Sequence, residues 1–161
     1  MMMSPNYKPV GGVESCTLYP ADAVTTALFS SDGCEVELGG TPIEVTLLEG
    51  ASHYDETSVF NHGASSVSHS LHLVADRGES QQWLDDSFLE RGAYDGFIAV
   101  IALNDGRRLL VGYSAHLGNE QPLRLEKISS ASGSTLRETP SVALHLISHD
   151  TDFSPEILES V

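Results

Sequence analysis

The seven histidines are the residues of this chain whose chemistry would first suggest a metal or catalytic site. His69 and His72 form the closest pair, but a spacing of three along a strand places them on opposite faces. His145 and His149 share a face at a separation of about 13 Å, and Asp150 and Asp152 beside His149 form an acidic cluster. No zinc spacing or EF-hand loop is present, so we expect neither a metal site nor a cofactor.

Candidate nucleophiles give an equally weak signal for catalysis. The stretch GYSAH at 112–116 lacks the second glycine of a GxSxG elbow, and no GxxxxGK phosphate loop occurs. Cys16 and Cys34 show no CxxC spacing, so we interpret them as small core residues with free thiols, although a disulfide between them stays open. We therefore do not expect an enzyme.

Composition and charge limit the classes of protein that remain. The 161 residues, 40% hydrophobic and 19% charged, indicate one globular domain. Acidic residues outnumber basic ones 23 to 8, which argues against binding to a nucleic acid backbone and keeps free subunits apart by repulsion. No apolar stretch is long enough to span a membrane or to act as a secretory signal, so we expect no membrane partner and a protein that stays in the cytoplasm or assembles there.

The elements that must position any site read mostly as strands. Residues 1–12 and the acidic residues 149–161 are predicted to be arms around one domain over residues 13–148, and the polar, glycine-bounded residues 50–63 are predicted to form a long loop containing at most a short strand. Strand patterns occur at 13–19, 25–30, 34–38, 41–49, 64–75, 97–103, 121–128 and 141–148, and the runs at 34–38 and 41–49 read as a hairpin.

One helix is predicted over residues 77–91. Asp76 and Glu79 fit a capping box at its start, and Gly92 fits its end. Trp83 is interpreted as the anchor of this helix in the core, with a sugar-stacking role as the alternative. The sequence thus predicts a mainly β protein, an antiparallel β-sandwich or barrel of about eight strands with one flanking α-helix.

The segment FIAVIALNDGRRLLVGY, residues 97–113, combines a strand apolar on both faces with a strong turn at Asn104, Asp105 and Gly106. A strand of this kind is typical of the centre of a sheet covered on both sides. Arg107 and Arg108 follow the turn and point to opposite faces. They are interpreted either as solvated residues that prevent edge pairing or as partners for a neighbour's carboxylates.

The layout resembles the major tail (tail tube) proteins of long-tailed phages and prophages and their relatives in contractile injection systems. It combines Gly11-Gly12, LYPAD at 18–22, a hairpin and polar loop, one helix, the 97–113 segment and the closing strand TPSVALHLISHD, over about residues 10–150. No signature motif accompanies this layout. The resemblance implies a structural virion protein that assembles in the host cytoplasm into stacked rings, typically hexamers, and contacts other tail proteins.

This resemblance also implies roles for particular residues. The candidate subunit contacts are Arg107, Arg108, Tyr54, Asp55 and Phe60. Ser66, Ser68 and Ser70 share one strand face and are candidates for the wall of an acidic lumen through which DNA passes without specific binding. The alternatives are a β-sandwich module that binds a sugar or another small ligand, or a different virion component such as a tail terminator or a head decoration protein.

Overall fold

The computed structural model describes residues 12–115, 117–131 and 140–158, and these residues form a mainly antiparallel β structure. The first sheet has the order β4-β1-β7-β8 and contains β1 (Val13–Pro20), β4 (Ile43–Val45), β7 (Phe97–Leu103) and β8 (Arg108–Val111). The second has the order β5-β6-β10-β9 and contains β5 (His53–Asn61), β6 (Ala64–Asp76), β9 (Arg124–Ala131) and β10 (Ser141–Asp150). A third sheet is the hairpin of β2 (Val24–Ser30) and β3 (Gly33–Leu38).

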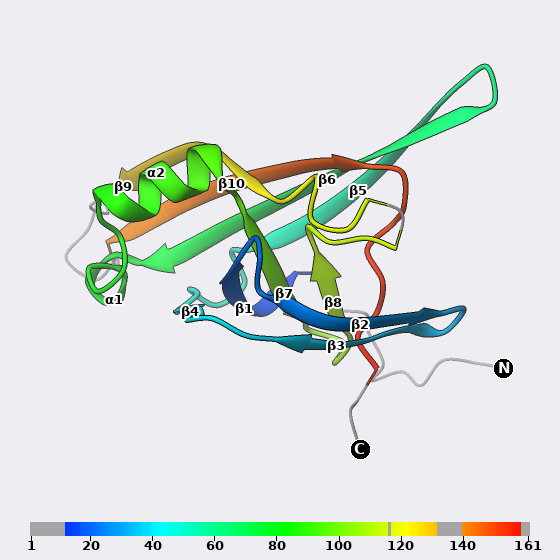
Figure 1. Cartoon of the computed structure of the whole chain (residues 1–161). Helices are drawn as coiled ribbons and strands as arrows, with labels where there is room; N and C mark the ends of the chain where they lie inside the picture. Colours follow the sequence, from blue (N-terminus) through cyan, green and yellow to red (C-terminus); the bar gives the residue numbers. More distant parts are fainter. Residues whose placement is uncertain (1–11, 116, 132–139, 159–161) are drawn as a thin grey trace, which may run out of the picture.

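The three sheets lie in layers, with the first sheet between the second sheet and the β2–β3 hairpin (Figure 1). The prediction of a mainly β antiparallel fold is confirmed. The described residues contain ten strands rather than about eight, and the sheets do not close into a barrel.

Strand β7 is covered on both faces, as its sequence predicts. Phe97, Ala99 and Ile101 belong to the main core between the two large sheets. Ile98, on the opposite face, packs with Leu110 and with Cys34 of the hairpin in a second, smaller core. Both cysteines are buried and free, which confirms their interpretation as core thiols.

The prediction of one helix over residues 77–91 is wrong, because the chain forms two short helices. These are α1 (Arg77–Ser80) and α2 (Asp86–Tyr94). Asp76 caps α1 as expected, but the Asp85 carboxylate accepts a hydrogen bond from the backbone amide of Phe88 and starts a new helix. Trp83 lies in the turn between them and packs its ring 4.8 Å from that of Phe88, so its role as a core anchor is confirmed. Neither helix of the described residues has the length and apolarity that crossing a membrane requires.

The predicted loop over residues 50–63 is replaced by strand β5. Burial alternates along this strand, since Tyr54, Glu56 and Ser58 are partly buried and the residues between them are exposed. Because most of the partly buried residues are polar, no alternation of apolar and polar residues marks the strand in the sequence. Pairing with β6 over nine positions satisfies backbone groups that an isolated polar segment leaves to water.

The predicted hairpin between residues 34–38 and 41–49 is also wrong. Strand β3 pairs with β2 through the turn at Ser31 and Asp32, and β4 pairs with β1. Gly40, with a positive φ of 77°, lets the chain leave the hairpin before β4 begins. The predicted N-terminal arm lies outside the described residues except for Gly12, and β10 extends two residues into the predicted C-terminal arm.

Helix α2 provides a test of how the core is held. Phe88 is fully buried and stacks on Phe97 at a ring distance of 5.1 Å, whereas Tyr94 on the same helix is 75% exposed. We expect Phe88→Ala to lower the free energy of unfolding by about 3–5 kcal/mol. The matched control Tyr94→Ala should change it by less than about 0.5 kcal/mol. Urea unfolding followed by tryptophan fluorescence measures both, and equal effects would contradict this account of the core.

Candidate functional site

Residues 151–158, called here the C-terminal strap, run from the end of β10 across the edges of the other two sheets (Figure 1). The strap accepts a hydrogen bond at the Pro155 carbonyl from the Leu110 amide, and its Ile157 amide donates to the Arg108 carbonyl, at 3.0 and 2.8 Å. The Cys34 amide donates to the Glu156 carbonyl at 2.8 Å. The strap therefore joins β8 of the first sheet to β3 of the hairpin.

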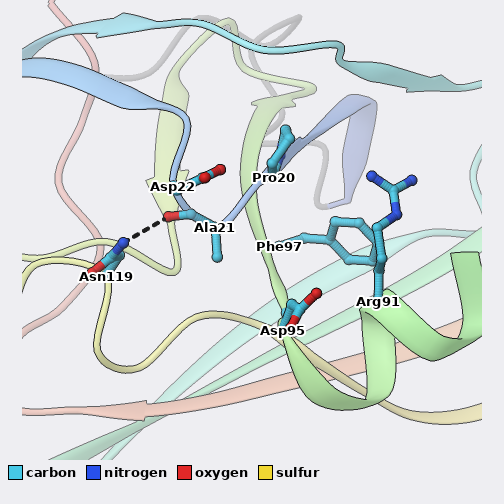
Figure 2. Close-up of a pocket in the computed structure, with 8 residues that line it drawn as sticks. Pro20, Ala21, Asp22, Arg91, Asp95, Phe97 and Asn119 are labelled. Atoms are coloured by element: carbon cyan, nitrogen blue, oxygen red, sulfur yellow. Dashed lines mark hydrogen bonds between the residues drawn. The ribbon is translucent and has the colours of Figure 1, made fainter.

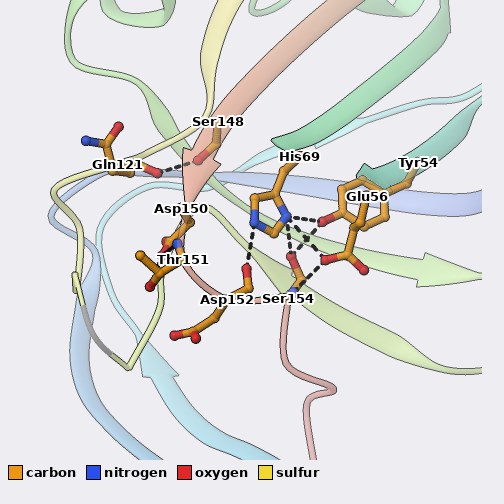
Figure 3. A network of polar contacts seen from close by, with 9 residues as sticks. All are labelled: Tyr54, Glu56, His69, Gln121, Ser148, Asp150, Thr151, Asp152 and Ser154. Atoms are coloured by element: carbon orange, nitrogen blue, oxygen red, sulfur yellow. Dashed lines mark hydrogen bonds and ion pairs between the residues drawn. The ribbon is translucent and has the colours of Figure 1, made fainter. Parts of the chain in front are cut away.

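The other half of the strap is bound to the second sheet by four residues, called here the polar cluster (Figure 3). Three of them, Tyr54, Glu56 and His69, belong to the sheet, and the fourth, Ser154, belongs to the strap. The Glu56 carboxylate accepts the Ser154 amide at 2.6 Å. Tyr54 Oη lies 2.6 Å from Ser154 Oγ and 2.6 Å from His69 Nδ1. The His69 side chain is only 4% exposed, so the cluster lies inside the fold rather than on its surface.

The backbone determines the tautomer of His69 in its neutral form. Nε2 lies 2.9 Å from the carbonyl oxygen of Asp152, which is only an acceptor, so Nε2 carries a proton. Nδ1 of the neutral ring then accepts from the hydroxyl of Tyr54 or of Ser154. Glu56 Oε2 is 3.3 Å from the same Nδ1, so the carboxylate and the two hydroxyls all lie around this one ring nitrogen.

Burial and hydrogen bonding have opposite effects on Glu56. Burial alone raises the pKa of the Glu56 carboxyl, but the close approach of the His69 ring and the hydrogen bond from the Ser154 amide more than offset this and hold it below its ordinary value. Burial, followed by the nearby Glu56 charge, raises the pKa of Tyr54 far above its usual range. The phenol therefore remains a hydrogen-bond donor at all ordinary pH values.

The geometry of the cluster differs from that of a Ser-His-acid triad. In a triad the serine and the carboxylate use opposite ring nitrogens of the histidine. Here Ser154 Oγ and Glu56 both approach Nδ1, and Nε2 is used by a backbone carbonyl. Burial also raises the pKa of the Cys16 thiol to about 12 and that of Cys34 to about 11, so neither is a ready nucleophile. The arrangement is suited to clamping the strap.

A hollow of about 360 Å³ adjoins the polar cluster. It brings together two of the predicted contact residues, Tyr54 and Arg107, with five others: Glu56, Leu103, Leu109, Ser154 and Glu156. Arg107 Nε donates to Asp105 Oδ2 at 2.9 Å, so its guanidinium is held at the rim. Arg108 is exposed at the start of β8.

The remaining predicted residues lie on the second sheet, away from this hollow. Asp55 is exposed on the outer face of β5, directly opposite Ser70. Ser66, Ser68 and Ser70 share that outer face, and Ser68 and Ser70 lie 3.2 Å and 2.7 Å from ring nitrogens of His149 and His145. This face therefore carries hydroxyls and imidazoles beside the single β5 carboxylate.

Phe60 lies near the tip of the β5–β6 hairpin, which extends beyond the rest of the molecule (Figure 1). The pairing of β6 with β10 ends at Val67 and Asp150, so the hairpin beyond this point is not supported by β10. Phe60 is 76% exposed and Val59 is 56% exposed. Because successive residues of a strand point to opposite faces, one apolar side chain is exposed on each face of the hairpin near its tip.

Sequence reasoning missed Glu56, His69 and Ser154 as a functional group. The available signal was His69 itself, because it occupies the strand face of Val67 and Leu71, where a polar side chain needs a buried partner. The partner Ser154 is 85 positions away in the chain, and no local pattern connects the two.

A second hollow, of about 420 Å³, lies between the end of β1 and the end of α2 (Figure 2). The Arg91 guanidinium lies 5.7 Å from the centre of the Phe97 ring, and Asp22 and Asp95 supply carboxylates. Arg91 Nε is buried and has no hydrogen-bond partner in the described part of the chain. Among residues 12–115, 117–131 and 140–158, no group of three or more His, Cys, Asp or Glu side chains is arranged to hold a metal ion.

Comparison with known proteins found no matching family model, no matching curated protein and no matching solved structure.

The polar cluster predicts a specific acid sensitivity. Because the folded pKa of Glu56 is below its ordinary value of 4.5, its stabilising contribution is present above that pH and is lost as the pH falls through the folded value. We expect Glu56→Gln to cost about 1–3 kcal/mol of unfolding free energy at pH 7 and progressively less below pH 4.5. Urea unfolding at a series of pH values measures this difference.

Asp55→Asn is the matched control, because Asp55 is the exposed neighbour on the same strand. It should leave stability at pH 7 nearly unchanged. A Glu56→Gln deficit that stays constant from pH 7 to pH 3 would contradict the assigned role of the carboxylate.

Proposed function

We propose that this protein is a structural subunit that assembles with copies of itself. The observation that carries the proposal is the β5–β6 hairpin, which extends past β10 and exposes Val59 and Phe60 at its end. Exposed aromatic side chains of this size favour contact with a partner surface over a free existence in water. A strongly acidic chain with formal charge −15 also needs specific contacts to overcome the repulsion between copies.

The edges of the second sheet support the same proposal. Strand β5 forms one edge and carries the exposed Asp55, whereas β9 forms the other and carries Arg124 and Lys127 beside Glu126. An edge strand offers unpaired backbone groups to another strand, and opposite charges favour β5 of one copy beside β9 of the next. A contact between two different edges is heterologous, so it propagates into a ring or a helical filament.

The particular assembly we propose is the tail tube of a phage or a related injection system. Its support is the mainly β fold, the acidic charge and the parts of the layout that the structure retains, which are LYPAD at 18–22, the 97–113 segment and the closing strand. The single helix, the hairpin at 34–49 and the polar loop at 50–63 that the layout also included are not found among the described residues. In this proposal hexameric rings form in the host cytoplasm and stack with other tail proteins in the virion. DNA then passes through the lumen without specific binding, because an excess of acidic groups repels the phosphate backbone.

A ligand-binding module is the second candidate, and the 420 Å³ hollow beside Arg91 is the observation in its favour. The aromatic ring in that hollow, Phe97, is 1% exposed. A ring this buried offers no face on which a sugar can stack. Assembly therefore has the stronger support.

Removing the apolar tip provides the direct test. We expect Phe60→Ser to weaken self-association by at least about tenfold, because an exposed aromatic anchor of the contact is lost. Sedimentation velocity and electron microscopy of the concentrated protein measure the assembly. Tyr94→Ser is the control, since Tyr94 is equally exposed but lies on α2. A wild-type protein that remains monomeric at high concentration, with and without other tail components, would refute the proposal.

The basic turn of the β7–β8 hairpin gives a second test. Arg107 and Arg108 are exposed, and reversing both to Glu adds negative charge where a neighbour's carboxylate is expected. We expect Arg107→Glu with Arg108→Glu to impair assembly and to leave the thermal unfolding of the monomer largely unchanged. Normal assembly of the double variant would show that the turn is only a solvated hairpin end.

A further inference from the structure

A hollow of about 150 Å³ lies on the second sheet, lined by five residues from three neighbouring strands: His72 of β6, Ala143 and His145 of β10, and Lys127 and Ser129 of β9. It is distinct from the polar cluster, because His72 and His69 are three residues apart on β6 and face opposite sides of the sheet. The hollow is therefore separate from the clamp that holds the strap.

Strand register explains how these groups come together. His53 is opposite His72, His72 is opposite His145, and His145 is opposite Lys127. The result is one row of basic side chains that crosses all four strands. The ring centres are 4.9 Å apart for His53 and His72 and 6.2 Å apart for His72 and His145.

Three hydrogen-bond donors in this hollow have no partner of their own. The Lys127 ammonium, the Ser129 hydroxyl and the His72 imidazole make no hydrogen bond or ion pair with any residue that the structure describes. His145 is different, because its Nε2 lies 2.7 Å from Ser70 Oγ and its Nδ1 lies 3.1 Å from Glu126 Oε1. The Glu126 carboxylate beside the hollow thus contacts His145 and forms no ion pair with Lys127.

We propose that this hollow binds a phosphate group, with Lys127, Ser129 and His72 as the donors. A compact ammonium, a hydroxyl and an imidazole N–H are the donors that recognise a tetrahedral oxyanion. The volume of about 150 Å³ accommodates a single phosphate group and excludes a large organic ligand. The chain has a formal charge of −15 and only eight Lys and Arg residues, so an unpaired lysine at the end of a row of three imidazoles is a local reversal of its charge.

Phosphate binding at this hollow is coupled to the uptake of a proton. Partial burial, with smaller contributions from His53 and His145, lowers the pKa of His72 below its ordinary value of 6.5. The other charged or titratable groups on this face are Asp55 of β5, His149 of β10, and Arg124, Glu126 and Lys127 of β9. A bound phosphate offsets the repulsion among the imidazoles, so it raises the pKa of His72 and binds more tightly as the pH falls.

The phosphate group has two possible sources with the same chemistry, free inorganic phosphate and the backbone of a nucleic acid. Binding of the second would contradict the passage of DNA without specific binding that the tail-tube proposal assumes. The test titrates the full chain with each source, sodium phosphate and a short oligothymidylate, at constant ionic strength. Histidine ring proton resonances are followed by NMR between pH 5.5 and pH 8. We expect a shift of the His72 resonance and a raised His72 pKa in the presence of either ligand. Inorganic phosphate itself changes charge between pH 5.5 and pH 8, so the pH dependence of affinity is read from the oligothymidylate, whose phosphodiesters do not titrate there, and we expect this affinity to be higher at pH 5.5 than at pH 8.

Two variants make the site specific. Lys127→Ala should weaken binding by about tenfold and abolish the rise in the His72 pKa, and His72→Asn should remove the pH dependence of affinity. His149→Asn is the control, because His149 is on the same face but outside the hollow. A response to phosphate alone identifies the free anion as ligand, and a response to the oligonucleotide identifies a phosphodiester. The proposal fails if neither source shifts His72, or if Lys127→Ala binds as wild type does.

Discussion

The hydrogen bond from the Ser154 amide to the buried Glu56 carboxylate is the constraint on which the arrangement of the layers depends. It fixes the C-terminal strap to the second sheet, while the strap backbone pairs with Arg108 and Leu110 of β8 and with Cys34 of the hairpin. One segment of eight residues thus contacts all three sheets. Releasing it would break the hydrogen bonds of the Cys34 and Leu110 amides and would uncover side chains that are fully buried with the strap in place.

The sequence predicts those elements whose pattern directly reflects burial. Strand β7 is apolar on both faces and is covered on both, and β6 alternates as its buried residues do. The prediction of a single helix is wrong because the Asp85 side chain caps the start of a second helix. Strand β5 was not predicted because its inward residues, Tyr54 and Glu56, make hydrogen bonds rather than apolar contacts. Local pattern reports hydrophobic burial well and polar burial poorly.

The candidate site shows the same limit over longer distances. The seven histidines form no sequence motif, because their contacts arise from strand register and from the strap. His72 lies opposite His145 on the neighbouring strand, and His69 contacts Ser154, which is 85 positions away in the sequence. Phe60 is exposed at the hairpin tip, whereas Tyr54 points into the polar cluster. Strand pairing therefore separates two residues that the sequence alone had grouped together as candidate subunit contacts.

Alternation along β5 and β6 divides the work of the second sheet between its two faces. The inner residues, Tyr54, Glu56 and His69, hold the strap, so changes to them alter stability throughout the fold. The outer residues, such as Ser70 and His72, are bounded by solvent and by each other. The inner and outer residues lie on opposite faces of the sheet and share no hydrogen bond among the described residues. A ligand on the outer face can therefore bind without breaking the contacts that hold the strap. Substitutions on the outer face are therefore expected to act independently of substitutions in the clamp.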